Sequence, residues 1–131
     1  MTATIPSASE LVLVDSSGWV AFLGGLPQGH QYAPFLADEN RLIVPTIILY
    51  EVFKKIRSIW GEVSAHRFLS HALRARVIPL DATLALAAAD LSAAHRLPMA
   101  DAIIYATAQS QDAQLVTSDS HFKDLPGVTL V

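Results

Sequence analysis

Four acidic residues occupy positions where a carboxylate could do chemistry: Asp15, Glu51, Asp101 and Asp119. Asp15 directly follows an apolar run at residues 11–14, and alanine and isoleucine surround Asp101. We expect both to be semi-buried, where a carboxylate without a partner is costly. A divalent cation removes that cost, because Mg²⁺ and Mn²⁺ prefer carboxylate oxygens and complete their coordination with water. Such a site suits phosphodiester hydrolysis, because the metal activates a water and neutralises charge on the leaving oxygen.

Each acid also has an ordinary structural explanation when it is considered alone. Asp15 and Asp119 are suitable N-caps for the segments that follow them. Asp101, expected in the first turn of a helix, is favoured there by the helix dipole. Glu51 and Lys55 have the i,i+4 spacing of a surface ion pair, which contributes only about 0.2–0.5 kcal/mol. The metal-site interpretation therefore depends on the four acids lying together.

Strands and helices alternate along the chain in the predicted fold. Short apolar runs predict a buried strand at residues 11–14 and further strands at residues 42–44, 77–80, 115–117 and 128–131. Helices are predicted between them, with Thr46 and Asp81 as N-caps, Gly61 as a stop and Pro98 as a start. This alternation predicts a parallel sheet covered by helices on both faces. Because ligands bind at the carboxyl ends of such strands, the four acids are expected to converge at one edge.

Composition predicts one well-packed domain. The chain has 131 residues, of which 52% are hydrophobic and 16% charged, and it contains no cysteine. We expect residues 1–9 to form a flexible N-terminal tail and residues 10–131 a single domain. The apolar surplus favours self-association or a partner. Without a signal peptide or an apolar run of about 18 residues, the chain is predicted to be cytoplasmic, with no membrane association.

Charge neither excludes nor supports a nucleic-acid substrate. The net charge is −3, and because the four acids contribute −4 of it, the rest of the chain sums to +1. Lys54, Lys55 and Arg57 cluster after Glu51 and could contact RNA phosphates, although a solvated basic face explains them equally well. The five histidines lack an HExxH-like spacing, so zinc is not predicted. His121 could touch a substrate phosphate, but a solvated surface histidine is the simpler interpretation.

The ordered set of acidic motifs resembles the PIN-domain family, and within it the VapC-type toxins of toxin–antitoxin modules. The resemblance covers nearly all of residues 11–131, and all four acidic positions match. No single motif is decisive, but the order of the set is distinctive. The segments that carry it are residues 13–17 (LVDSS), 50–56 (YEVFKKI), 95–108 (HRLPMADAIIYATA) and 115–126 (LVTSDSHFKDLP).

The resemblance implies a three-layer α/β/α sandwich with a short, mainly parallel sheet. It also implies an endoribonuclease that uses Mg²⁺ or Mn²⁺ and forms a homodimer, inhibited by an antitoxin whose C-terminal segment covers the active-site groove. Asp15, Asp101 and Asp119 would then be metal ligands, and Glu51 a ligand or the residue that orients the water. Ser17 and Thr117 would hold metal-bound water or phosphate, although local backbone hydrogen bonding explains both equally well.

Two other classes of function are considered. A PIN-like module that binds RNA or protein without cutting it stays open as an alternative. Such a module would usually have lost one of the acids, whereas all four are present here. Phosphoacceptor domains need a paired acid or an Asp-x-Asp motif at the first strand, whereas Asp15 is followed by Ser16 and Ser17. Gly-rich phosphate-binding loops are also absent from the sequence.

Overall fold

A five-stranded parallel sheet forms the centre of the protein in a computed structural model, which describes residues 10–131. The predicted tail at residues 1–9 lies outside the described residues. The strand order is β3-β2-β1-β4-β5, and every neighbouring pair is parallel. The strands are β1 (Val12–Val14), β2 (Leu42–Pro45), β3 (Arg76–Ile78), β4 (Gln114–Thr117) and β5 (Val128–Leu130).

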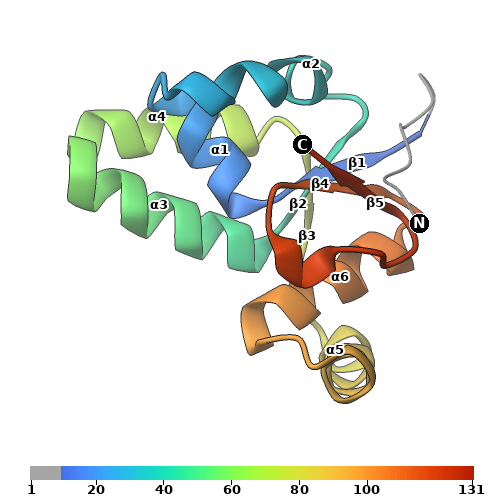
Figure 1. Ribbon diagram of the computed structural model, residues 1–131. Coiled ribbons are helices and arrows are strands. Elements are labelled where there is room, and N and C mark those ends of the chain that lie inside the picture. Colours follow the sequence, from blue (N-terminus) through green and yellow to red (C-terminus); the bar gives the residue numbers. More distant parts are fainter. Residues whose placement is uncertain (1–9) are drawn as a thin grey trace.

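Helices cover both faces of the sheet, as predicted. Figure 1 shows α1 to α4 on one side and α5 and α6 on the other. The α/β/α fold class inferred from the sequence is thereby confirmed. The helical elements are α1 (Ser16–Leu23), η1 (Pro27–Gln31), α2 (Ala33–Leu36), α3 (Thr46–Trp60), α4 (Glu62–Ala72), α5 (Ala82–His95), α6 (Met99–Ser110) and η2 (Ser120–Phe122).

The central strands determine where the acids emerge. All residues of β1 are buried, as expected for a strand covered by helices on both faces. It pairs with β2 on one side and with β4 on the other, so that Val14 lies opposite Val116. Because β1 and β4 run in the same direction, the residues that follow them leave the sheet at the same edge. This arrangement brings Asp15 and Thr117 together across 102 residues of sequence.

Most predicted helix ends are confirmed, but the one at Thr46 is wrong. The Asp81 carboxylate accepts the N–H of Leu84 at 2.9 Å and caps α5. Gly61, with φ +93°, ends α3. By contrast, α3 has no side-chain cap, because the Thr46 hydroxyl accepts the N–H of Leu80 at 3.3 Å. Thr46 therefore ties the start of α3 to the segment after β3.

The two tryptophans lie in different environments. Trp19 is fully buried and packs edge-on against Phe68, with ring centroids 5.2 Å apart. Trp60 is 39% exposed and lines a surface groove at the end of α3. None of the helices within residues 10–131 is long and apolar enough to cross a membrane.

Candidate active site

Asp15 is the most buried of the four acids, with 5% of its surface exposed. Its Oδ1 accepts the N–H of Ser16 at 2.8 Å, which caps α1, and its Oδ2 accepts the hydroxyl of Thr117 at 2.8 Å. Burial raises the pKa of Asp15, and the charges of Asp101 and Asp119 raise it further. The hydrogen bonds from Thr117 and Ser16 oppose that rise in the pKa. Asp15 is thus a helix cap whose charged form is disfavoured by burial and by the neighbouring acids.

Thr117 connects two of the acids from the end of β4. It is fully buried, and its hydroxyl donates to Asp15 while accepting the N–H of Asp119 at 3.0 Å. The carboxylate of Asp119 in turn caps η2 by accepting the N–H of His121 at 2.9 Å. One hydroxyl therefore fixes the relative positions of Asp15 and Asp119.

Asp101 approaches from the first turn of α6 and meets His121. The Nδ1 of His121 lies 2.9 Å from Oδ2 of Asp101 and 3.2 Å from Oδ1 of Asp119. Burial raises the pKa of Asp101, opposed by the hydrogen bond from His121, and the charge of Asp119 adds to the rise. The pKa of His121 is raised, first by its hydrogen bond to Asp101 and then by the charge of Asp119. These three side chains each offer one ligand atom, all within 4.8 Å of one another.

Glu51 completes the site from α3. Its Oε1 is buried and has no hydrogen-bond partner among residues 10–131, and it forms no ion pair with Lys55 in that part of the chain. Burial raises the pKa of Glu51, the nearby Ser16 hydroxyl opposes the rise, and the charges of Asp15 and Asp101 add to it. A buried carboxylate oxygen without a partner is costly unless a cation or a water meets it.

The residues present fit a divalent cation. Three carboxylates have raised pKa values, each partly because the other acids are near. Their mutual repulsion is the condition that a bound cation relieves. Carboxylate oxygens are the ligands that Mg²⁺ and Mn²⁺ prefer, and the partly exposed Asp119 and His121 leave room for metal-bound water.

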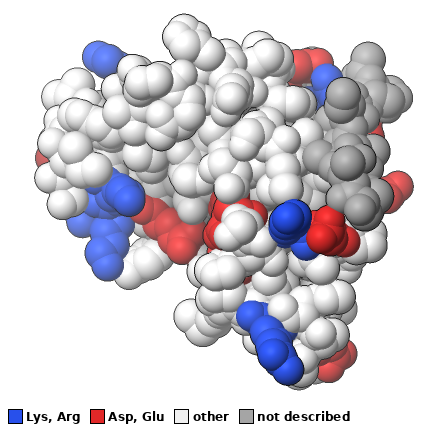
Figure 2. All heavy atoms as spheres, in the orientation of Figure 1, with Lys and Arg blue, Asp and Glu red and all other residues white. Residues whose placement is uncertain are grey.

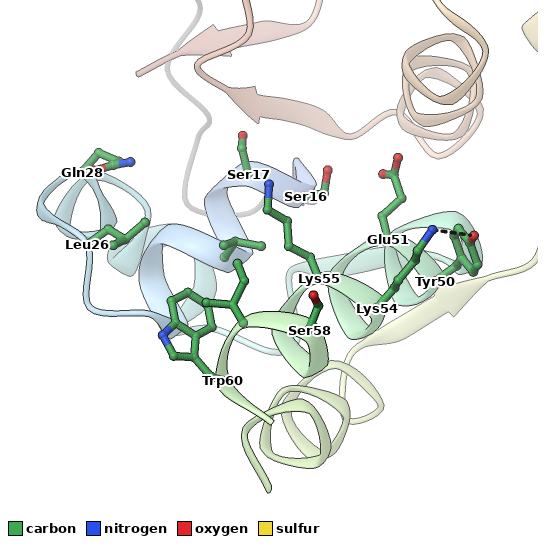
Figure 3. A pocket seen from close by; sticks show the side chains of 12 residues that line it. Ser16, Ser17, Leu26, Gln28, Tyr50, Glu51, Lys54, Lys55, Ser58 and Trp60 are labelled. Carbon is green, nitrogen blue, oxygen red and sulfur yellow. Dashed lines mark hydrogen bonds between the residues drawn. The ribbon is translucent and has the colours of Figure 1, made fainter. Parts of the chain in front are cut away.

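A groove of about 910 Å³ lies along α1 and α3, and Glu51 is the acid of the site that lines it. In Figure 3 Glu51 and the side chain of Lys55 extend toward the side where Ser16 and Ser17 lie. Both charged and apolar side chains line the groove. Its lining residues are Ser16, Ser17, Val20, Leu26, Gln28, Tyr50, Glu51, Lys54, Lys55, Ser58, Ile59 and Trp60.

The predicted basic residues divide between two grooves. Lys54 and Lys55 line the groove beside the acids, and Lys54 lies over the Tyr50 ring at 5.5 Å. Arg57 instead lies over the Phe53 ring at 5.1 Å and lines a second groove. Figure 2 shows Lys and Arg side chains gathered over α3 beside Asp and Glu side chains. The basic charge nearest the acids therefore comes from the two lysines.

Two residues near the acids have different contacts from those expected. The Ser17 hydroxyl makes no hydrogen bond to the four acids within residues 10–131, whereas the neighbouring Ser16 donates to Asp15. His121, expected at the solvated surface, is 56% exposed and yet bridges Asp101 and Asp119. The sequence feature that could have indicated this contact of His121 is the predicted N-cap at Asp119. Such a cap brings the backbone N–H of the residue two places later to the Asp119 carboxylate.

Replacing Thr117 by valine is expected to lower the free energy of unfolding by about 1–3 kcal/mol, because the Asp119 N–H and an Asp15 oxygen lose their partner. Thr117→Ser keeps the hydroxyl but loses a methyl group, at a cost of about 1 kcal/mol. Urea denaturation of both variants at neutral pH measures the difference. If valine is tolerated better than serine, packing rather than hydrogen bonding determines this position.

Solved structures with the same fold include toxins and toxin–antitoxin complexes. A toxin–antitoxin complex from Klebsiella pneumoniae has a TM-score of 0.78 at 23% identity, covering 90% of this chain and 95% of that one. A DNA-bound VapBC complex from Salmonella typhimurium has a TM-score of 0.75 at 19% identity, covering 93% and 97%. VapC20 from Mycobacterium tuberculosis, a toxin that cleaves the sarcin–ricin loop, has a TM-score of 0.67 at 19% identity, covering 79% and 85%.

These likenesses are below 25% identity and establish the fold. No curated protein sequence matches the chain. The model of the PIN domain, however, matches residues 12–128, which include all four acids, the strands that two of them follow and the helices that carry the others. On that match, the chain belongs to the PIN domain family.

Proposed function

We propose that this protein is a metal-dependent endoribonuclease that hydrolyses RNA phosphodiester bonds, and that it is the toxin of a type II toxin–antitoxin pair. The observation that carries the proposal is the meeting of Asp101, Asp119 and His121 beside Asp15 and Glu51 at the carboxyl edge of the sheet. The toxins among its structural neighbours support it. The proposal includes a cytoplasmic location, where RNA is available to such a toxin.

Each acid has a distinct part in the proposed mechanism. Asp15, Asp101 and Asp119 hold the Mg²⁺ or Mn²⁺ ion, with Thr117 keeping Asp15 and Asp119 in register. When bound, the cation supplies an activated water and neutralises charge on the phosphate. Glu51, with an unpartnered oxygen and a raised pKa, is a ligand or orients the attacking water and accepts its proton.

The substrate is positioned by the groove. Lys54 and Lys55 lie along it close to Glu51, where their ammonium groups can contact RNA phosphates on the side of the acids. Arg57, which pairs with Glu62 at 3.8 Å and lines the second groove, would contact RNA only outside the site itself. Ser17 is exposed on the groove wall and is available to a phosphate or a metal-bound water.

Cleavage of RNA in the presence of Mn²⁺ or Mg²⁺, and its loss on addition of EDTA, is the expected result that tests the function. Purified protein is incubated with total RNA, and the products are separated on a denaturing gel. Excess Mn²⁺ added after the EDTA should restore cleavage. Cleavage that persists in EDTA contradicts the metal mechanism, and binding of RNA without cleavage under any metal favours the non-catalytic PIN-like module.

We also propose that the protein is a homodimer and that an antitoxin covers the groove beside the acids. The structural neighbours include complexes of toxin with antitoxin. Exposed apolar side chains such as Leu86 and Met99, 70% and 76% exposed, are consistent with an interface. Light scattering at micromolar concentration should give twice the mass of 14.1 kDa. A monomer mass across that range contradicts the dimer.

A further inference from the structure

We propose that His121 is itself a metal ligand, and that its nitrogen makes the site prefer a first-row transition metal such as Mn²⁺ over Mg²⁺. The inference rests on the proposed metal site and identifies the cation that the site takes. Two observations carry it: the position of the imidazole nitrogen between two carboxylates, and the way the backbone of η2 holds that position.

The distances suit ligands of one cation. The Nδ1 of His121 lies 2.9 Å from a carboxylate oxygen of Asp101 and 3.2 Å from one of Asp119. Two neighbouring ligand atoms of an octahedral cation with bonds of about 2.1 Å are about 3.0 Å apart. The three donor atoms also lie within 4.8 Å of one another. A single ion that contacts all three therefore needs only small side-chain adjustments.

The backbone of η2 keeps the ring within reach of the acids. Asp119 caps η2 by accepting the backbone N–H of His121, so the main chain of His121 stays beside the acid, and the ring turns its Nδ1 toward both carboxylates. Within residues 10–131 the His121 ring nitrogen contacts Asp101 and Asp119, and its side chain is 56% exposed. The exposed side leaves space for the waters that complete the coordination of a partly hydrated ion.

The nitrogen decides which cation is favoured. Mg²⁺ takes oxygen ligands and releases its waters reluctantly, whereas imidazole is a ligand of first-row transition metals. A site of carboxylates alone would bind Mg²⁺ and Mn²⁺ through the same groups. The addition of His121 should therefore raise the affinity for Mn²⁺ selectively and leave Mg²⁺ binding nearly unchanged.

The competing explanation is that His121 occupies the place of the cation and competes with it. In that case the ring must leave when the metal binds, and removing it should strengthen metal binding. The two explanations predict opposite effects of the same substitution, so one set of variants separates them. His121→Ala and His121→Asn both remove the Nδ1 ligand, and the second keeps a polar side chain of similar reach. His30→Ala, at an exposed histidine in η1, is the matched control.

The experiment titrates Mn²⁺ into metal-free full-length protein and follows free Mn²⁺ by electron paramagnetic resonance, with Mg²⁺ affinity measured by competition. Pulsed spectra of the Mn²⁺ complex should show coupling to a ¹⁴N nucleus in the wild type and in His30→Ala. Both His121 variants should lose that coupling and bind Mn²⁺ at least about tenfold more weakly. Mg²⁺ affinity should stay roughly the same in all four proteins.

Three results would overturn the inference. They are a wild-type complex without ¹⁴N coupling, His121 variants that bind Mn²⁺ as tightly as the wild type, and variants that bind it more tightly. Each leaves the proposed nuclease intact as long as Mn²⁺ binds and Asp101→Asn abolishes that binding. If the wild type binds no divalent cation, the proposed function itself fails.

Discussion

Asp101→Asn is expected to lower the rate of RNA cleavage by about 100-fold or more, because the amide is a poor substitute for a metal-binding carboxylate. The same change should raise the melting temperature of the metal-free protein. The pKa of Asp101 is raised, so its charged form is the less stable one in the fold, and the neutral amide removes that cost. It should also weaken the stabilisation by Mn²⁺.

Asp90→Asn is the matched control, because Asp90 is exposed on α5. It removes the same charge from the chain and should change neither the cleavage rate nor the response to Mn²⁺. Cleavage assays and melting curves of the two variants, with and without Mn²⁺, make the comparison. If Asp101→Asn lowers the metal-free melting temperature and leaves the Mn²⁺ shift intact, Asp101 is a structural residue and the proposed site is wrong.

The metal-free protein is expected to become more stable as the pH falls below neutral. The folded-state pKa values of Asp15 and Asp101 are raised above the ordinary value of 3.8, and that of Glu51 above 4.5. A carboxylate of this kind binds its proton more readily in the folded state, so stability is gained as the pH falls through the raised pKa. The gain is complete below the unfolded pKa.

His121 acts in the same direction. Its folded pKa is raised above 6.5, so its contribution to stability is present below that value and is lost as the pH rises through the folded pKa. Mn²⁺ at neutral pH should stabilise the fold by about 2.7 kcal/mol at a concentration 100 times its dissociation constant. Melting curves at pH 5.5 and 7.5, with and without Mn²⁺, test both effects.

Two outcomes bear on this second prediction. The stabilisation on lowering the pH should be smaller in Asp101→Asn than in the wild type, since one of the responsible groups is absent. Mn²⁺ should reduce the pH dependence, because it neutralises the same repulsion that protons relieve. A metal-free protein that loses stability steadily between pH 7.5 and 5.5 would contradict the assignment of raised pKa values to this cluster.

The fold could be predicted largely because its central strands, β1, β2 and β4, are fully buried. A strand covered on both faces must be apolar throughout, so residues 11–14 and 115–117 are evident in the sequence. Since consecutive strands alternate with helices, a parallel sheet follows, and with it the shared edge at Asp15 and Asp119. Thr46 was predicted less well, because capping competes with a tertiary hydrogen bond to Leu80 that sequence spacing does not reveal.

The site was harder to predict wherever the direction of a side chain depends on packing. Ser16 and Ser17 are equivalent by sequence, but the start of α1 directs the N–H and hydroxyl of Ser16 to Asp15 and leaves Ser17 on the groove wall. Arg57 and Lys54 are three residues apart, yet Lys54 lines both grooves and Arg57 only the second. His121 depends on a turn of three residues, which is too short for a periodic pattern.

The central position of β1 has a consequence for how the proposed nuclease activity would be lost on heating. The amide of Asp15 donates to the carbonyl of Val116 at 3.0 Å, so this acid belongs to the innermost hydrogen-bonded ladder, which opens only when the sheet comes apart. His121 lies instead on a three-residue turn, half exposed, and Asp101 lies at the first turn of a helix. Segments of that kind exchange their amide hydrogens through local fraying at a much lower free energy. The side of the site formed by Asp101 and His121 should therefore open while Asp15 stays in place. Cleavage should then cease well below the temperature at which the sheet melts.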